Sequence, residues 1–168
     1  MKTKTLLSTA IVISLLFFFS QCKKKATEED KMLFDKAKVT TGFTYYKNNS
    51  TVLASSPQSA HNAFFRVRFN ATARAALTDS GRLPAGGSFP DGSLIVKELY
   101  DSQSGSLQLL AVMEKATGNS LSGANWLWAE YKDDGALVYS ISKKGEGCTG
   151  CHGSAGSRDY MRLFELFP

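Results

Sequence analysis

Residues 64–69 read Phe-Phe-Arg-Val-Arg-Phe, and their side chains alternate with the two-residue period of a β-strand. Phe65, Val67 and Phe69 fall on one face of such a strand. The opposite face carries Phe64 and the two arginines, so it is largely polar. The pattern, which extends back to residue 63, therefore predicts a strand that packs one side against a core.

Four runs downstream of this strand also have strand character. They cover residues 93–100, 107–115, 126–132 and 136–142. Asp133-Asp134-Gly135, between the last two runs, is typical of a hairpin turn. Short strands joined by tight turns predict an antiparallel sheet of about five strands.

Helices are expected on both sides of this sheet in the sequence. Residues 28–38 begin with three acidic residues and end with lysines, which suits the helix dipole, and Thr27 is a suitable N-cap. A short helix is expected at residues 71–77 and an amphipathic closing helix at residues 159–167. The predicted fold is therefore α+β, with a five-stranded antiparallel β-sheet flanked by N- and C-terminal helices.

Residues 1–21 have the composition of a secretion signal, with two early lysines before an apolar run too short to span a bilayer comfortably. Cys22 follows at once, and residues 22–27 form a Lys-rich tether, an arrangement that resembles a bacterial lipoprotein. We expect an exported, periplasmic protein that a lipid on Cys22 anchors to a membrane. The alternative is an ordinary cleaved signal that leaves Cys22 free and exposed. Residues 28–168 then form one domain.

Composition narrows the choice of partners. The formal net charge is +5, from 20 Lys and Arg against 15 Asp and Glu, and no long basic patch interleaves with aromatic residues. Nucleic acid is therefore not expected as a partner. With Cys22 assigned to the anchor, only Cys148 and Cys151 remain, too few for a disulfide scaffold.

Residues 148–152 read Cys-Thr-Gly-Cys-His, the spacing of a haem c attachment site. Two thiols at this spacing reach the two vinyl groups of one porphyrin, and His152 then lies beneath the iron as its axial ligand. The export signal agrees independently, because haem c matures outside the cytoplasm. The alternatives are a redox-active cysteine pair, a disulfide, or a zinc site that adds His61 to Cys148, Cys151 and His152. We expect one covalent haem c.

The motif and its surroundings resemble the cytochrome P460 family, which includes the cytochromes c′-beta. The resemblance covers residues 63–167 and rests on the Pro-Asp-Gly strand at 89–98, the strand at 112–115, Asn-Trp-Leu-Trp at 125–128 and the late haem motif. It implies a β-rich mono-haem protein, often a homodimer, with five-coordinate iron bound by His152. One branch oxidises hydroxylamine with a haem crosslinked to a lysine. The other binds nitric oxide or carbon monoxide in an apolar distal pocket with phenylalanines.

This resemblance directs attention to particular side chains. Lys97 is the candidate for a crosslink, because an apolar strand face would make it a nucleophile, although its ammonium could equally reach solvent or a haem propionate. Phe65 and Phe69 either line the distal pocket or belong to the ordinary core. Glu114 and Glu130 are weaker candidates for a distal proton acceptor, against a role as solvated strand residues.

Three functions follow from these candidates. The first is a five-coordinate haem protein that binds a small diatomic ligand such as nitric oxide. The second is an enzyme that oxidises hydroxylamine or related nitrogen species, and the third is a six-coordinate electron carrier with Met113 or another side chain as sixth ligand. The sequence does not identify a redox partner protein. His61 stands alone in a polar loop, so we expect it to be exposed.

Overall fold

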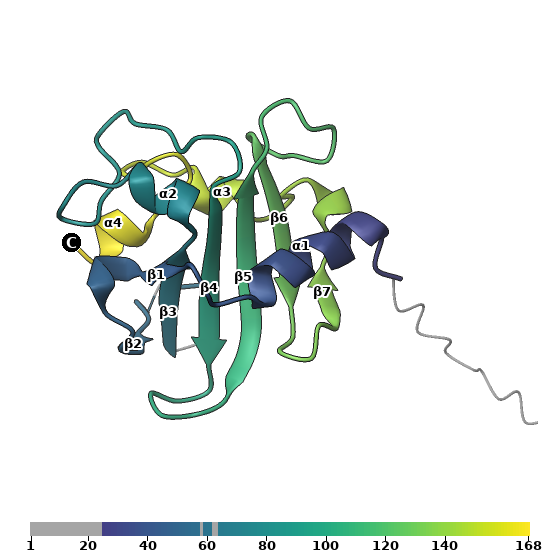
Figure 1. Cartoon of the computed structure of the whole chain (residues 1–168), viewed down its shortest axis with the longest axis horizontal. Coiled ribbons are helices and arrows are strands. Elements are labelled where there is room, and N and C mark those ends of the chain that lie inside the picture. Colours follow the sequence, from purple (N-terminus) through teal and green to yellow (C-terminus); the bar gives the residue numbers. More distant parts are fainter. Residues whose placement is uncertain (1–24, 58, 62–63) are drawn as a thin grey trace, which may run out of the picture.

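The computed structural model describes residues 25–57, 59–61 and 64–168. Its central element is one antiparallel sheet (Figure 1). The strands are β1 (Thr44–Tyr45), β2 (Leu53–Ala54), β3 (Phe64–Phe69), β4 (Leu94–Tyr100), β5 (Leu107–Lys115), β6 (Trp126–Tyr131) and β7 (Leu137–Tyr139). Their order across the sheet is β1-β3-β4-β5-β6-β7, and β2 also pairs with β3. The helices are α1 (Glu28–Lys38), α2 (Ala71–Ala75), α3 (Thr149–His152) and α4 (Leu163–Leu166), with 3-10 turns at η1 (Tyr46–Asn48) and η2 (Ile141–Lys143).

The predicted fold class is confirmed, but the strand count is too low. The sheet has seven strands rather than five, because β1 and β2 were not expected. Each has two residues, which is too short for an alternating pattern to show in the sequence. The last predicted strand also ends early, since β7 stops at Tyr139 and the chain turns into η2.

The closing helix is shorter than predicted. Residues 159–167 were expected to be helical, whereas α4 covers only Leu163–Leu166. Asp159 and Tyr160 have φ angles of 47° and 67°, in the left-handed region that a right-handed helix cannot include. The chain therefore makes a turn at this point before α4 begins.

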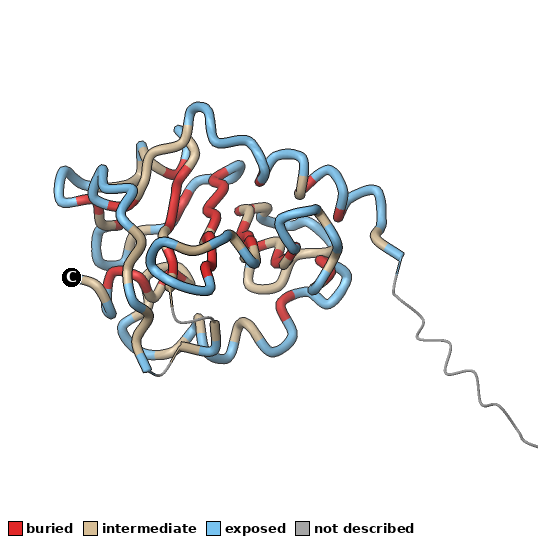
Figure 2. Tube along the Cα trace, turned by 90° about the horizontal axis from the view of Figure 1, so that it is seen from below, coloured by how far each residue is buried: buried red, intermediate tan, exposed pale blue. Residues whose placement is uncertain are grey.

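The two faces of the sheet are buried against different parts of the chain. Along β4, Leu94 and Val96 pack with Leu33 and Ala37 of α1, whereas Ile95 belongs to a second cluster on the opposite face. The C-terminal segment with α3 and α4 covers that opposite face (Figure 1). Figure 2 shows the buried residues concentrated along the strands and the exposed ones in the connecting loops. Strand alternation thus gives one sheet two separate cores.

Helix α1 is fixed at both ends by side chains. Thr27 and Asp30 form a capping box, and Asp30 also accepts hydrogen bonds from Ser140 Oγ and the Ile141 backbone, both at 3.0 Å. At the other end, the Arg68 guanidinium donates to the carbonyls of Ala37 and Val39. These carbonyls have no partner within the helix, so Arg68 satisfies them from the sheet. The helix expected at residues 28–38 is confirmed.

Among the described residues, no helix combines the length and apolar content needed to cross a bilayer. The expected signal at residues 1–21 and the lipidation site Cys22 lie outside the described residues.

Candidate haem site

A cavity of about 290 Å³ lies on the face of the sheet that α1 does not cover. The C-terminal segment closes over it from the other side. The sheet wall is mostly apolar and comes from alternate residues of four neighbouring strands: Phe65 and Val67 of β3, Ile95 of β4, Ala111 and Met113 of β5, and Trp128 of β6. Its charged members are Lys97 of β4 and Glu130 of β6. Such an apolar wall suits a flat, largely hydrophobic ligand.

The Cys-x-x-Cys-His motif borders this cavity. Cys148, Cys151 and His152 all line it, and both thiols are free. Burial raises the pKa of the Cys148 thiol, against an opposing hydrogen bond from Tyr139. A nucleophilic, redox-active cysteine has a lowered pKa, so Cys148 does not have the activation expected of such a nucleophile.

A glycine allows the motif to lie against the sheet. Gly145 has a φ of 73°, and a Cβ atom there would lie 2.6 Å from Trp128 of β6. Any larger residue would both strain the backbone and push the motif away from the indole. The ring of His152 consequently packs on Trp128, with centroids 5.1 Å apart and planes at 73°.

The orientation of His152 is set by a backbone carbonyl. Its Nδ1 lies 2.9 Å from the carbonyl oxygen of Tyr160, to which the N–H donates. Burial lowers the pKa of the imidazole, partly offset by this hydrogen bond, so the neutral ring is favoured. A neutral imidazole with Nδ1 donating to a carbonyl keeps the lone pair of Nε2 for a metal, the usual state of a ligating histidine.

The Tyr160 carbonyl is in turn held by the turn at Asp159. The Asp159 carboxylate accepts hydrogen bonds from the Phe89 backbone at 2.8 Å and from Ser88 Oγ at 3.0 Å. It also pairs with Lys115 Nζ at 2.7 Å and accepts from Trp126 Nε1 at 3.3 Å. This network, which we call the Asp159 cluster, ties the turn to β5 and β6 next to the cavity. Sequence patterning missed it, because its partners are far apart in the chain.

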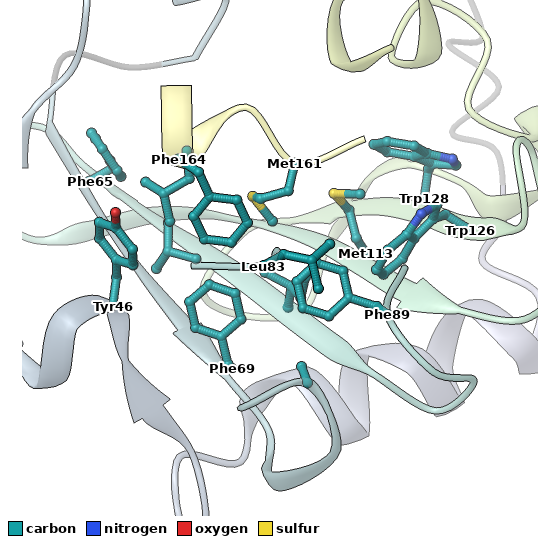
Figure 3. Close-up of a cluster of buried hydrophobic side chains, with 14 residues drawn as sticks. Tyr46, Phe65, Phe69, Leu83, Phe89, Met113, Trp126, Trp128, Met161 and Phe164 are labelled. Carbon is teal, nitrogen blue, oxygen red and sulfur yellow. The ribbon is translucent and has the colours of Figure 1, made fainter. Parts of the chain in front are cut away.

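Of the two predicted phenylalanines, the structure brings only one to the cavity. Phe65 lines it, whereas Phe69 points to the same face but packs against Phe89, with stacked rings 6.4 Å apart. Figure 3 shows both among the buried side chains of one cluster. Lys97 also lines the cavity, with Nζ 4.5 Å from the Phe65 ring centroid. Burial lowers the pKa of Lys97 to about 8.

The two candidate glutamates lie on opposite faces of the sheet. Glu130 lines the cavity, and burial raises the pKa of its carboxyl group. Glu114 points toward α1, where it pairs with Lys36 at 2.7 Å. The structure therefore does not bring Glu114 to the site, because β5 presents Met113 there instead.

The expectation that His61 is exposed is wrong. It lines the cavity with 22 % of its side chain exposed, and its ring centroid lies 6.4 Å from that of His152. Its Nδ1 lies 3.7 Å from Glu130 Oε1. Burial, followed by the nearby Lys97 and His152, lowers the pKa of His61 to about 4. The one available signal in the sequence was that the chain has only two histidines.

Comparison with known families agrees with this geometry. The family model described as cytochrome P460 matches residues 44–162. The chain belongs to the cytochrome P460 family. No curated protein matches the chain at a significant level. As a member of the P460 family, it is a haem-binding cytochrome.

The residues of this cytochrome P460 site fit a haem. Two thiols and an oriented imidazole lie along one edge of an apolar cavity, which is the donor set that binds porphyrin and iron. Haem supplies an iron that can bind a small ligand or exchange an electron. The protein would supply His152 as the iron ligand, a largely apolar wall that limits water, and a nearby cationic or nucleophilic group in Lys97.

Proposed function

We propose that the chain is an exported mono-haem c-type cytochrome that binds a small diatomic ligand such as nitric oxide. In this proposal each of the Cys148 and Cys151 thiols adds across one vinyl group, and His152 holds the iron. The observation that supports it most strongly is the hydrogen bond from His152 Nδ1 to the Tyr160 carbonyl, in a cavity that both thiols also line. It presents the imidazole in the form that binds iron.

The apolar residues of the cavity favour a small uncharged molecule as the ligand. Phe65, Ile95 and Met113 give the cavity an apolar stretch of wall that offers no hydrogen bond to bound water or anions, beside the polar groups of His61, Lys97 and Glu130. Nitric oxide and carbon monoxide bind iron without needing such bonds. We also propose a periplasmic location through a lipid on Cys22, with residues 22–27 as tether, and a homodimer as the assembly typical of the family.

We expect protein matured in a host competent for cytochrome c assembly to carry one haem that survives denaturation and organic extraction. Because each thiol adds across a vinyl group without loss of atoms, the mass should rise by that of one haem. The double variant Cys148→Ser/Cys151→Ser should lose covalent haem, and Thr149→Ser should retain it as the control. Adding nitric oxide should shift the ferrous absorption spectrum. A colourless wild-type protein with unmodified thiols at these positions would contradict the proposal.

A second candidate is oxidation of hydroxylamine with a lysine–haem crosslink. It is favoured by the position of Lys97, whose Nζ lies in the same cavity and whose pKa is lowered to about 8, so the uncharged amine is accessible near neutral pH. The crosslink would replace an N–H of Lys97 and a C–H of the porphyrin by a C–N bond, and a peroxide would accept the two electrons and two protons and be reduced to water.

If Lys97 forms this crosslink, proteolysis of the holoprotein should yield the Lys97 peptide attached to haem, and the ferrous band should be red-shifted. In the Lys97→Met variant, the peptide that contains residue 97 should carry no haem. The ferrous band should move to shorter wavelength, while the thioether links remain. Lys143→Met, which replaces a lysine packed on Tyr139, is the control. Identical spectra for wild type and Lys97→Met would exclude the crosslinked form.

A further inference from the structure

We propose that His61 is the sixth ligand of the haem iron when no external ligand is bound. The resting iron would then be six-coordinate, with His152 on one side and His61 on the other, and nitric oxide or carbon monoxide would bind by displacing His61. The inference rests on the proposed haem attachment and departs from the five-coordinate iron that the family resemblance implies.

The separation of the two imidazoles carries this proposal. Their ring centroids are 6.4 Å apart, and their planes are at 77°. With metal–nitrogen bonds of about 2 Å, two imidazoles on opposite sides of one metal ion have centroids roughly 6 Å apart. The observed spacing therefore matches a pair of axial ligands, although the two residues lie in distant parts of the sequence.

The groups beside the two rings also support axial ligation by both histidines. His152 has its Nδ1 against the Tyr160 carbonyl, and His61 has its Nδ1 on the side of Glu130, 3.7 Å from Oε1. In both rings Nε2 is the nitrogen left available to a metal. An acceptor beside the second ring nitrogen is the usual companion of a metal-bound histidine. The Tyr160 carbonyl is hydrogen-bonded to His152, whereas the Glu130 carboxylate lies near His61 at more than hydrogen-bond distance.

Other side chains of the cavity are weaker candidates for the sixth position. Met113 and Met161 belong to the buried apolar cluster, where Figure 3 shows their side chains beside each other among aromatic rings. Lys97 Nζ lies over the Phe65 ring. His61 does not belong to that cluster and lies in the connection between β2 and β3. It is the residue that can leave the iron without disturbing the core.

Such a ligand would act as a filter. An incoming molecule gains access only during the fraction of time in which His61 has left the iron, and its apparent affinity falls by that fraction. Nitric oxide, which forms a strong bond to iron, can overcome this competition. Molecules that bind iron weakly cannot, so His61 would set which ligands occupy the site.

The test compares wild-type, His61→Ala and Met113→Leu holoproteins by absorption and electron paramagnetic resonance, followed by mixing with carbon monoxide. We expect low-spin, six-coordinate iron in wild type and high-spin iron in His61→Ala. Carbon monoxide should bind His61→Ala about 10–100-fold faster. Added imidazole should restore the low-spin spectrum of His61→Ala. Met113→Leu conserves volume in the core and should resemble wild type.

The outcomes separate this inference from the proposed function. High-spin, five-coordinate wild-type iron, or low-spin iron in His61→Ala, would overturn the role of His61 while leaving covalent haem and nitric oxide binding intact. Conversion to high spin in Met113→Leu alone would assign the sixth position to Met113. A wild-type protein without haem would overturn both proposals.

Discussion

Replacing Asp159 by alanine is expected to lower the free energy of unfolding by about 3–5 kcal/mol, because it leaves the Lys115 ammonium buried without a counter-charge. Only 6 % of the Lys115 side chain is exposed, and Asp159 is its ion-pair partner. The same change removes the acceptor of the Phe89 and Trp126 N–H groups. Alanine also tolerates the left-handed conformation of residue 159 poorly.

The substitution of Asp159 should also disturb the surroundings of the haem iron. Without the Asp159 cluster, the Tyr160 carbonyl is no longer held against His152 Nδ1, so the ligand field of the haem should become heterogeneous. Urea unfolding measures the first effect, and electron paramagnetic resonance measures the second. Asp159→Asn separates charge from backbone, since asparagine accepts the left-handed conformation. Asp79→Ala, at an exposed position, should change stability by less than about 0.5 kcal/mol. Equal stability of Asp159→Ala and wild type would contradict the importance of the cluster.

Replacing Glu98 by alanine should have a similarly large effect on the other face of the sheet. Glu98 and Arg68 are 3 % and 1 % exposed, and the carboxylate also binds Arg66 and Tyr100. Its removal leaves a buried guanidinium unpaired, which costs about 3–5 kcal/mol. Since Arg68 also holds the last carbonyls of α1, we expect α1 to loosen from the sheet.

The pKa of Glu98 also predicts that the folded protein loses stability at acidic pH. Burial raises its pKa, but hydrogen bonds from Arg66, Arg68 and Tyr100 outweigh burial, and the pKa lies below the usual 4.5. A carboxyl group whose pKa is lower in the folded state contributes stability that is fully present above the unfolded pKa and is lost as pH falls through the folded one. Wild type should therefore lose more stability between neutral pH and pH 3 than Glu98→Gln. Asp133→Ala, in an exposed turn, should retain the wild-type pH profile; parallel profiles for wild type and Glu98→Gln would refute the argument.

The elements that could be predicted are those with local causes. The alternation of residues 64–69, the Thr27 cap of α1 and the spacing of the haem motif each depend on neighbouring residues. The turn at Asp159 could not be predicted, because it depends on Phe89, Lys115 and Trp126.

The sequence also could not predict which face of the sheet borders the cavity. Leu94 and Val96 are as apolar as Ile95 and Leu99 on the other side of β4, so both faces look like core. Glu114 was a candidate for this reason, although β5 turns it toward α1. His61 was passed over because a polar loop carries no periodic signal that would place it above the cavity.

Cys148 caps the four-residue helix α3 and Cys151 lies within it, so thioether bonds from both would connect no distant parts of the chain. Such bonds would attach the haem without restricting the unfolded polypeptide. An iron shared by His61 and His152 would do the opposite, because it closes a loop of roughly ninety residues, and loop closure of that length is worth about 4.6 kcal/mol in the chain-entropy account. The bond between His61 and iron, which an incoming gas must break, would then also be a cross-link that stabilises the folded domain. Ligand binding would therefore lower the stability of the whole domain.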